Sequence, residues 1–362
     1  MQRAQSPVKH KKTILSDVPI VQKTPRAVVV PEEKKRCSVV LAFTIVALVV
    51  SFLCTYYGAM YFIDGSAALA KRFRVPVLVI GLTIVAFGTS VPEMFVAIVS
   101  YFKGVPTLSV GNLLGSSFAD ISLVLGIVAL IRPIHIKVDF LRREFPFVIV
   151  AAVLLFLLAS DGELTWGDGL ILILSFCVYL YYTLIVRMLE NKVRPSEEII
   201  EEKELRKLQL LEAESKKVSL FYLFGGLITL LLGAHWLTDS AVTLARYLQV
   251  SDFVIGITLI SFGTVLPELI TGIMASVKGE EDIEVGNALG SFIFNILFIF
   301  GFFTLLQPIA IPINWLFFEI PVMLGVGILL IPLMRRNFTL GRLEGILLIL
   351  IYLVYISKQI LF

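Results

Sequence analysis

The amino-acid sequence predicts an all-α membrane protein of ten transmembrane helices, built as two inverted repeats of five helices. Three observations support this fold class. With 57% hydrophobic and 16% charged residues and a mean hydropathy of +0.91, the chain is too apolar for a soluble protein of 362 residues. Its apolar runs are continuous rather than alternating, which excludes a closed β-barrel. Finally, one long motif occurs twice in the chain.

The apolar runs give ten spans when each is measured against the length that crosses a bilayer, about 20 residues of helix. These spans lie at 38–69, 77–101, 107–131, 144–159, 168–188, 218–247, 253–277, 284–306, 315–334 and 343–361.

Two polar segments divide the chain into domains. Residues 1–36 are basic and rich in proline, and lack the apolar stretch of a signal peptide, so they predict a disordered tail. Residues 189–217 hold charges of both signs, with pairs such as Glu202 and Arg206 at helical spacing, and predict a cytoplasmic linker. The two five-helix repeats then occupy residues 37–188 and 218–362.

The repeat itself is clear in the letters of the sequence. The stretch "IGLTIVAFGTSVPE" at 80–93 matches "IGITLISFGTVLPE" at 255–268, and "VGNLLGSSFAD" at 110–120 matches "VGNALGSFIFN" at 285–295. Both matches have the same offset of 175 residues, which indicates an internal duplication rather than a shared composition.

An odd number of spans in each half makes the second half enter the membrane in the opposite orientation, as in inverted-repeat transporters. The connections after odd-numbered spans contain nearly all the Lys and Arg residues outside the tail. By the positive-inside rule these connections face the cytoplasm and both termini lie outside. The basic tail favours the opposite orientation.

Each copy of the motif places costly polar residues inside a span. Thr89 and Glu93, like Thr264 and Glu268, are four residues apart and therefore share one helix face. The same spacing recurs on the next span, between Ser116 and Asp120 in the first half and between Ser291 and Asn295 in the second. Placing an ionised carboxylate within the membrane costs free energy, so its presence in both copies predicts a functional site.

A proline accompanies each glutamate. Pro92 and Pro267 cannot donate a helical hydrogen bond, which frees the carbonyl groups of Gly88 and Gly263. Unpaired backbone at membrane depth is tolerated only where it lines a cavity or meets protein. We therefore expect broken helices from both halves to meet near the middle of the membrane.

The resulting set of carboxylate, hydroxyl, amide and carbonyl groups consists of oxygen ligands and suits hard cations such as Na⁺, Ca²⁺, K⁺ or Mg²⁺. Glu93, Glu268 and Asp120 would neutralise one Ca²⁺ and leave a charge that could hold a proton or a further monovalent ion. A simpler interpretation is that the small residues only allow close helix packing. The glutamate in both copies at one offset argues against it.

The four stretches "AFGTSVPE", "GNLLGSSFAD", "SFGTVLPE" and "GNALGSFIFN" resemble the α-repeats of the calcium/cation antiporter superfamily, in its Na⁺/Ca²⁺-exchanger-like branch. The resemblance covers about residues 37–362. It implies a set of ion ligands drawn from both halves: Ala86 (carbonyl), Thr89, Ser90, Glu93, Ser116, Asp120, Ser261 (carbonyl), Thr264, Glu268, Ser291 and Asn295.

The resemblance also implies a function. The chain would be a secondary active antiporter, not an enzyme, that exchanges Ca²⁺ for Na⁺ by alternating access while its first and sixth helices slide over a fixed core. Ca²⁺ and Na⁺ would be transported partners in the lipid bilayer of a plasma or inner membrane. No resident cofactor and no nucleic acid partner is expected.

Two departures from the family pattern leave alternatives open. Val265 stands where a hydroxyl matching Ser90 is usual, which favours a H⁺-coupled antiporter of Ca²⁺ or another divalent cation as the second hypothesis. The acid and amide at Asp120 and Asn295 occur in the opposite order in some relatives, which preserves the number of carboxylates. A cation-binding sensor without transport is a third possibility, but such a protein would not need two matched half-sites.

Two further groups of charges have simpler interpretations. Asp64 and Asp239 are repeat equivalents near the ends of spans, where solvation or helix pairing is favoured over a gate. The acidic stretch Glu280, Glu281, Asp282 and Glu284 predicts a solvated face in preference to a funnel that attracts cations.

Overall fold

The computed structural model describes residues 31–73, 76–102, 106–186, 216–249, 261–313 and 315–361. Almost all of the tail predicted at 1–36 and the linker predicted at 189–217 lies outside these ranges. Helix α1 begins at Pro31, inside the stretch predicted as tail. The described residues from Leu41 onward form one compact unit.

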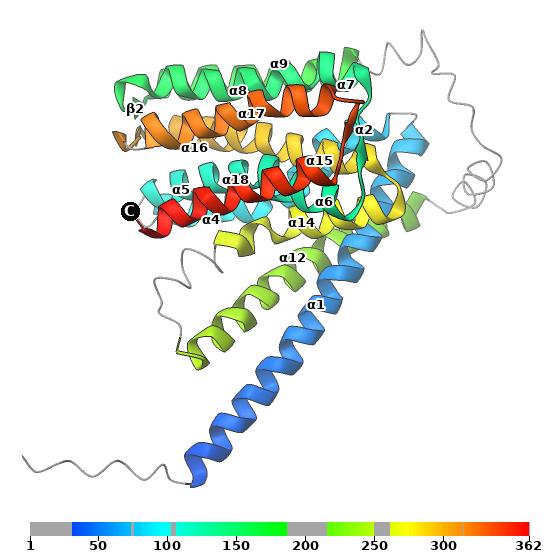
Figure 1. The fold of residues 1–362 in the computed structure, drawn as a ribbon, viewed down its shortest axis with the longest axis vertical. Helices are drawn as coiled ribbons and strands as arrows, with labels where there is room; N and C mark the ends of the chain where they lie inside the picture. Colours follow the sequence, from blue (N-terminus) through cyan, green and yellow to red (C-terminus); the bar gives the residue numbers. More distant parts are fainter. Residues whose placement is uncertain are drawn as a thin grey trace, which may run out of the picture. The chain divides into compact units, whose positions relative to one another are not determined.

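The first half consists of helices, two short strands and several tighter or wider helical turns. Its elements are α1 (Pro31–Phe73), α2 (Val77–Ile80), η1 (Gly81–Val85), α3 (Ala86–Thr89), α4 (Val91–Phe102), α5 (Pro106–Ala119), η2 (Asp120–Val124), α6 (Leu125–Ile131), β1 (Ile134–His135), α7 (Val138–Arg143), α8 (Phe145–Leu158), η3 (Ala159–Asp161), β2 (Glu163–Leu164), α9 (Trp166–Tyr181) and η4 (Tyr182–Val186) (Figure 1).

The second half has the same kinds of element. They are α12 (Lys216–Tyr247), α14 (Ser261–Lys278), α15 (Glu281–Ile293), η6 (Phe294–Ile299), α16 (Phe300–Leu306), β3 (Ile309–Ala310), η7 (Trp315–Glu319), α17 (Ile320–Arg335), β4 (Thr339–Leu340) and α18 (Arg342–Leu361). Of the segments labelled η in either half, η3 is a 3₁₀ turn and the others are π-helical.

Eight helical segments in the described ranges are long and apolar enough to cross a membrane: Leu41–Ala70, Val77–Ile98, Ser109–Ile131, Val138–Asp161, Trp166–Ile185, Val218–Tyr247, Glu281–Leu306 and Trp315–Arg335. They coincide with eight of the ten predicted spans. The predicted span at 253–277 lies partly outside the described residues. The last predicted span is present as α18, a 20-residue helix that contains Arg342, Glu344 and Lys358.

The duplication is visible in the boundaries of the elements. α6 and α16 begin and end at positions 175 residues apart, as do β1 and β3. The π-helical turn η2 contains Asp120, and its counterpart η6 contains the equivalent Asn295. Because a π-helical turn inserts a residue into the helix and often marks a functional site, its recurrence at these two residues agrees with the site predicted there.

The halves are interleaved, because equivalent elements contact the opposite half in equivalent ways. Strand β1 pairs antiparallel with β4, and β2 pairs antiparallel with β3, so each strand bonds to a strand of the other half. In the same manner α6 packs against α18 and α16 packs against α9. The two halves therefore share one large hydrophobic core rather than forming separate domains.

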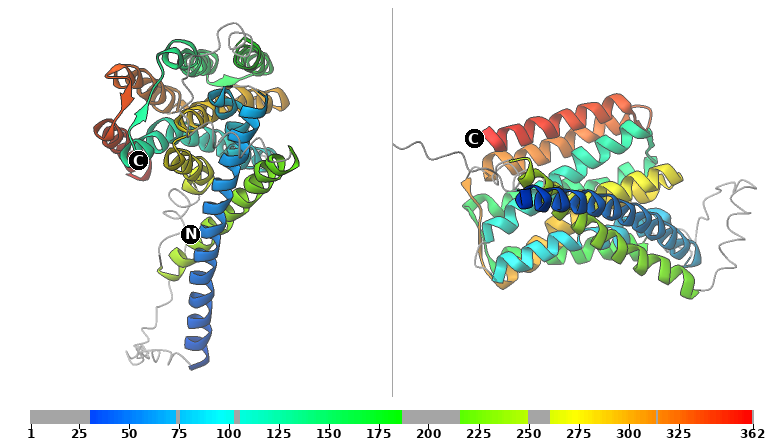
Figure 2. Two further views of the ribbon diagram at one scale, coloured as in Figure 1. Left: turned by 90° about the vertical axis from the view of Figure 1, so that its right-hand side faces the viewer. Right: turned by 90° about the horizontal axis from the view of Figure 1, so that it is seen from below.

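Helices α1 and α12 cross in close contact (Figures 1 and 2). A methyl group added at Gly58 would overlap the backbone of Leu230, and one added at Gly233 would overlap that of Thr55. The two contacts are repeat equivalents, and each depends on the missing side chain of glycine. Buried residues of α1 and α12 form a second, smaller apolar cluster with parts of α2, η1, α14 and α15.

The helices that contain the two glutamate motifs differ. In the first half α3 ends at Thr89, Ser90 forms a turn with ψ of 9°, and α4 begins again at Val91 with Pro92 in its first turn. In the second half α14 continues from Ser261 through Pro267 to Lys278. The predicted break is therefore present at the first motif, whereas the described part of the second motif is one continuous helix.

Candidate functional site

Three carboxylates from both halves lie buried in the core, namely Glu93 on α4, Asp120 on η2 and Glu268 on α14. Each is at most 1% exposed. They are close enough for their charges to interact, since Glu93 and Asp120 both act electrostatically on Glu268, and Glu93 acts on Asp120. Three like charges at this depth repel one another unless a cation or protons compensate them.

Thr89 and Ser90 of the first half contact the second half directly. Ser90 Oγ donates to Glu268 Oε1 at 3.5 Å. Thr89 Oγ1 donates to Asn287 Oδ1 at 3.0 Å and lies 3.3 Å from Ser291 Oγ. The fold therefore joins the two copies of the motif into one polar cluster, as the repeat predicted.

The backbone also contributes to this cluster. The carbonyl oxygen of Ala86 lies 3.5 Å from the Ser291 hydroxyl and 3.3 Å from the Thr89 hydroxyl, so it faces the same polar cluster. Its repeat equivalent, Ser261, begins α14, and the surroundings of its side chain lie outside what the structure describes.

The π-helical turn η6 of the second half is joined to helix α5 of the first half by a hydrogen bond. Asn295 Nδ2 donates to Ser116 Oγ at 3.3 Å. The amide nitrogen thus points to the hydroxyl, which leaves Asn295 Oδ1 buried without a partner beside the carboxylate cluster.

Several buried oxygen atoms of the predicted ligands have no hydrogen-bond donor among the described residues. They are both carboxylate oxygens of Glu93, both of Asp120, Oε2 of Glu268 and Oδ1 of Asn295. The Thr264 side chain lies close to the Glu93 carboxylate. Buried polar atoms are normally paired, so a concentration of unpaired acceptors in one cluster calls for a compensating partner, and a cation would provide one.

The carboxylates alone do not form a closed metal cage. Within the described ranges no three side chains of the His, Cys, Asp and Glu types are close enough together to hold a metal ion. Hydroxyl, amide and carbonyl oxygens must therefore supply part of any coordination shell. This mixture of oxygen ligands suits hard cations such as Na⁺, Ca²⁺, K⁺ or Mg²⁺.

Two residues of the cluster, Asn112 and Asn287, were not predicted from the sequence. Asn112 Oδ1 accepts from Thr264 Oγ1 at 3.3 Å, just as Asn287 Oδ1 accepts from Thr89. Both asparagines follow glycine in the repeated "VGN" stretches. Their recurrence at the offset of 175 was the signal that could have identified them.

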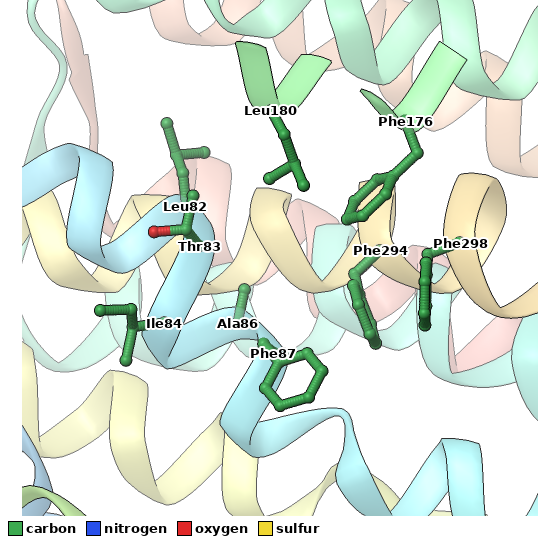
Figure 3. Close-up of a pocket in the computed structure, with 9 residues that line it drawn as sticks. All are labelled: Leu82, Thr83, Ile84, Ala86, Phe87, Phe176, Leu180, Phe294 and Phe298. Atoms are coloured by element: carbon green, nitrogen blue, oxygen red, sulfur yellow. The ribbon is translucent and has the colours of Figure 1, made fainter. Parts of the chain in front are cut away.

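A cavity of about 360 Å³ adjoins the cluster but is apolar (Figure 3). Phe87 and Phe294 form part of its wall and pack edge to face, with ring centroids 5.2 Å apart. The lining residues are Leu82, Thr83, Ile84, Ala86, Phe87, Phe176, Leu180, Phe294 and Phe298. This wall is almost entirely apolar and provides almost no cation ligands.

The acidic stretch after α14 is not uniformly solvated, contrary to the expectation. Glu281 pairs with Arg132, with Oε1 and Nη2 3.7 Å apart. Asp282 pairs with Lys137, with Oδ2 and Nζ 2.8 Å apart. Glu284 is only 1% exposed, because the first turn of α15 packs against α14. The prediction of a solvated face is therefore wrong for Glu284.

The two repeated aspartates have different partners. Asp64 pairs with Lys278 of α14, with Oδ1 and Nζ 2.5 Å apart, so it joins α1 to a neighbouring helix. Asp239 lies 3.4 Å from His235 on its own helix. Helix pairing, one of the expected roles, is thus present for Asp64.

Comparison with known proteins found a matching family and relatives that align with most of this chain. The family described as "Sodium/calcium exchanger protein" matches residues 43–185 and 218–361. The inner membrane protein YrbG of Escherichia coli is 34% identical over 302 residues, which cover 83% of this chain and 92% of YrbG. The sodium/calcium exchanger MaX1 of Methanosarcina acetivorans is 28% identical over 327 residues, which cover 83% and 93%.

The fold also matches a solved structure. A structure of the sodium-calcium exchanger NCX_Mj superposes with a TM-score of 0.73 at 29% sequence identity, covering 87% of this chain and 98% of that one. An inverted-repeat membrane fold fits this match and the interleaved halves described above.

Proposed function

Since the chain belongs to the sodium/calcium exchanger family, we propose that this integral multi-pass membrane protein exchanges Ca²⁺ for Na⁺ by alternating access. The family is one of cation antiporters rather than enzymes, in agreement with the prediction from sequence. The proposal also covers the ion ligands, the helices that move and the ion that drives Ca²⁺ transport.

One observation supports the proposal above all others. The unpaired buried oxygens of Glu93, Asp120, Glu268 and Asn295 come from both halves and lie within one cluster. The charge of the three carboxylates exceeds that of one Ca²⁺, and several Na⁺ ions could replace the divalent ion in the same cluster. A site that binds either cargo, but not both, is what obligatory exchange requires.

The proposed ion ligands are those expected from the sequence. They are Ala86 and Ser261 through their carbonyl groups, together with the side chains of Thr89, Ser90, Glu93, Ser116, Asp120, Thr264, Glu268, Ser291 and Asn295. With ten helices in two inverted repeats, this set would lie near the middle of the membrane.

For the conformational change, we propose that α1 and α12 slide together over the rest of the protein. Gly58 and Gly233 bring the two backbones into contact, so they can move as one pair. The small apolar cluster of these helices is separate from the large core, which supports motion between them. Such motion would expose the ion site alternately to the two sides of a plasma or inner membrane.

A second candidate, H⁺-coupled exchange of a divalent cation, is favoured by one specific difference between the halves. Val265 replaces the hydroxyl equivalent to Ser90 and is buried in the apolar core. One Na⁺ position then has one ligand fewer. Glu93, which is fully buried, could carry a proton in place of that ion.

Flux in proteoliposomes separates these candidates. Purified protein is reconstituted, and ⁴⁵Ca²⁺ uptake is measured with an imposed Na⁺ gradient, an imposed H⁺ gradient or neither. Uptake driven by the Na⁺ gradient supports the proposal. Uptake that responds to the H⁺ gradient alone supports the second candidate, and Ca²⁺ binding without any flux would support a sensor instead.

A further inference from the structure

We propose that Asn112 and Asn287 are positioning residues, each of which orients the ion-binding threonine of the opposite half. The inference rests on the proposed function, because it concerns how Thr89 and Thr264 act as ligands. Neither asparagine belongs to the predicted ligand set. Their position in the repeat and their hydrogen bonds assign this role.

The two hydrogen bonds are equivalent by the repeat and both cross between the halves. Thr89 of the first half donates to Asn287 at 3.0 Å, and Thr264 of the second half donates to Asn112 at 3.3 Å. An incidental contact would not be expected to recur at repeat-equivalent positions. The arrangement therefore belongs to the duplicated site itself.

The chemistry of a hydroxyl group explains why this bond matters. A threonine hydroxyl has one hydrogen and two acceptor lone pairs. When the hydrogen is donated to an asparagine oxygen, only lone pairs remain to face the cluster, and lone pairs are what a cation requires. The amide performs this task without adding a charge that would compete for the cation.

Without Asn287, the hydroxyl hydrogen of Thr89 has another acceptor nearby. The carbonyl oxygen of Ala86 lies 3.3 Å from Thr89 Oγ1 and is itself a proposed ion ligand. A hydrogen turned toward this carbonyl would occupy one of its lone pairs. Loss of Asn287 would thus weaken two ligands, the threonine and the carbonyl.

The two asparagines differ in their burial and in the hydrogen bonds that fix their amide groups. Asn287 is fully buried, and its Nδ2 donates to the backbone carbonyl of Glu268 at 3.5 Å, which directs Oδ1 toward Thr89. Asn112 is only partly buried, and its Nδ2 has no partner among the described residues. We therefore expect a larger effect from removing the amide of Asn287.

Double-mutant cycles on Ca²⁺ affinity test this role. In the wild-type background, Asn287→Ala should raise the Ca²⁺ dissociation constant about fivefold, the value of one ordinary hydrogen bond. In a Thr89→Val background, which has no hydroxyl to orient, the same substitution should have almost no effect. In a Thr264→Val background the fivefold effect should persist.

The mirror cycle provides the matched control. Asn112→Ala should couple to Thr264→Val and be additive with Thr89→Val, with a smaller effect of about twofold. Ser122→Ala removes a buried hydroxyl whose hydrogen bond goes to Phe118 of its own helical segment, and it should leave affinity unchanged. A merely structural role would lower affinity equally in both threonine backgrounds.

The readouts are ⁴⁵Ca²⁺ binding to purified protein and flux in proteoliposomes, with thermal stability measured for each variant. If Asn287→Ala does not fold, Asn287→Asp keeps an acceptor oxygen, and Thr89→Val should remain costly in that background. Additive effects in all four combinations would overturn the positioning role while leaving exchange intact. Absence of Ca²⁺ flux in the wild type would instead overturn the proposed function.

Discussion

The two halves of the molecule share a backbone plan but differ in how their glutamates are held. Glu268 accepts a hydrogen bond from Ser90, whereas Val265, the residue equivalent to Ser90, has no hydroxyl group to donate to Glu93. The surrounding helices and strands remain equivalent. Duplication thus preserves the framework while single side chains make the two half-sites chemically unequal.

The backbone near the two motifs differs as well. The helix that contains the first motif is interrupted at Ser90, whereas the described part of the second motif is one continuous helix through Pro267. A proline in the first turn of a helix costs little, but one in the interior removes a hydrogen bond. The local backbone conformation therefore differs between the two motifs.

The largest expected effect comes from replacing the buried glutamate that each half contains. Glu93→Gln and Glu268→Gln should each abolish ⁴⁵Ca²⁺ uptake into proteoliposomes, because removing a charge from a buried divalent site costs far more than removing a neutral ligand. Glu163→Gln, at an exposed position on β2, should transport normally. Near-normal uptake in either site variant would contradict the location of the site.

The opposite orientation of the halves can be tested at two repeat-equivalent exposed positions. Asp161→Cys and Arg336→Cys, each in a chain without Cys37, Cys54 and Cys177, should react with an impermeant thiol reagent from opposite sides of the membrane. The positive-inside rule places Asp161 outside and Arg336 in the cytoplasm. Labelling of both from one side would exclude inversion.

Because the contact between α1 and α12 is repeat-equivalent, substituting its glycine in either half should destabilise the protein to a similar extent. Gly58→Leu and Gly233→Leu each force a side chain against a backbone, which should destabilise the protein by about 1–3 kcal/mol or more and slow transport. Gly225→Leu provides the control, because the atoms nearest to an added methyl group there are 3.9 Å away. Thermal stability in detergent measures the effect, and a harmless substitution at only one of the two glycines would show that the contact is not equivalent.

The smallest expected effect comes from making the halves alike. Val265→Ser should give Glu93 the donor that Ser90 gives Glu268, and should lower the half-saturating Na⁺ concentration about fivefold with Ca²⁺ affinity nearly unchanged. Ser90→Val should act in the opposite direction. Identical Na⁺ dependence in wild type and Val265→Ser would show that this position is not at an ion site.

Much of the fold could be predicted because its signals are local. The apolar spans follow from composition, and the repeat identified Glu93 and Glu268 as equivalent residues, which the structure buries close together. The burial of Glu284 could not be predicted in this way, since its acidic neighbours indicated a solvated face. It depends on how closely α15 packs against α14, which a local pattern does not record.

The amino-acid sequence by itself determined the membrane class, the duplication and the residue types that can bind a hard cation, because hydropathy and repetition are written along the chain. Only the tertiary structure decided which oxygen atoms are paired. Ser90 meets Glu268, and Asn287 meets Thr89, across nearly two hundred residues of chain. Whether a buried oxygen has a donor or needs a cation depends on these contacts between the halves, and they arise only when the two repeats interleave.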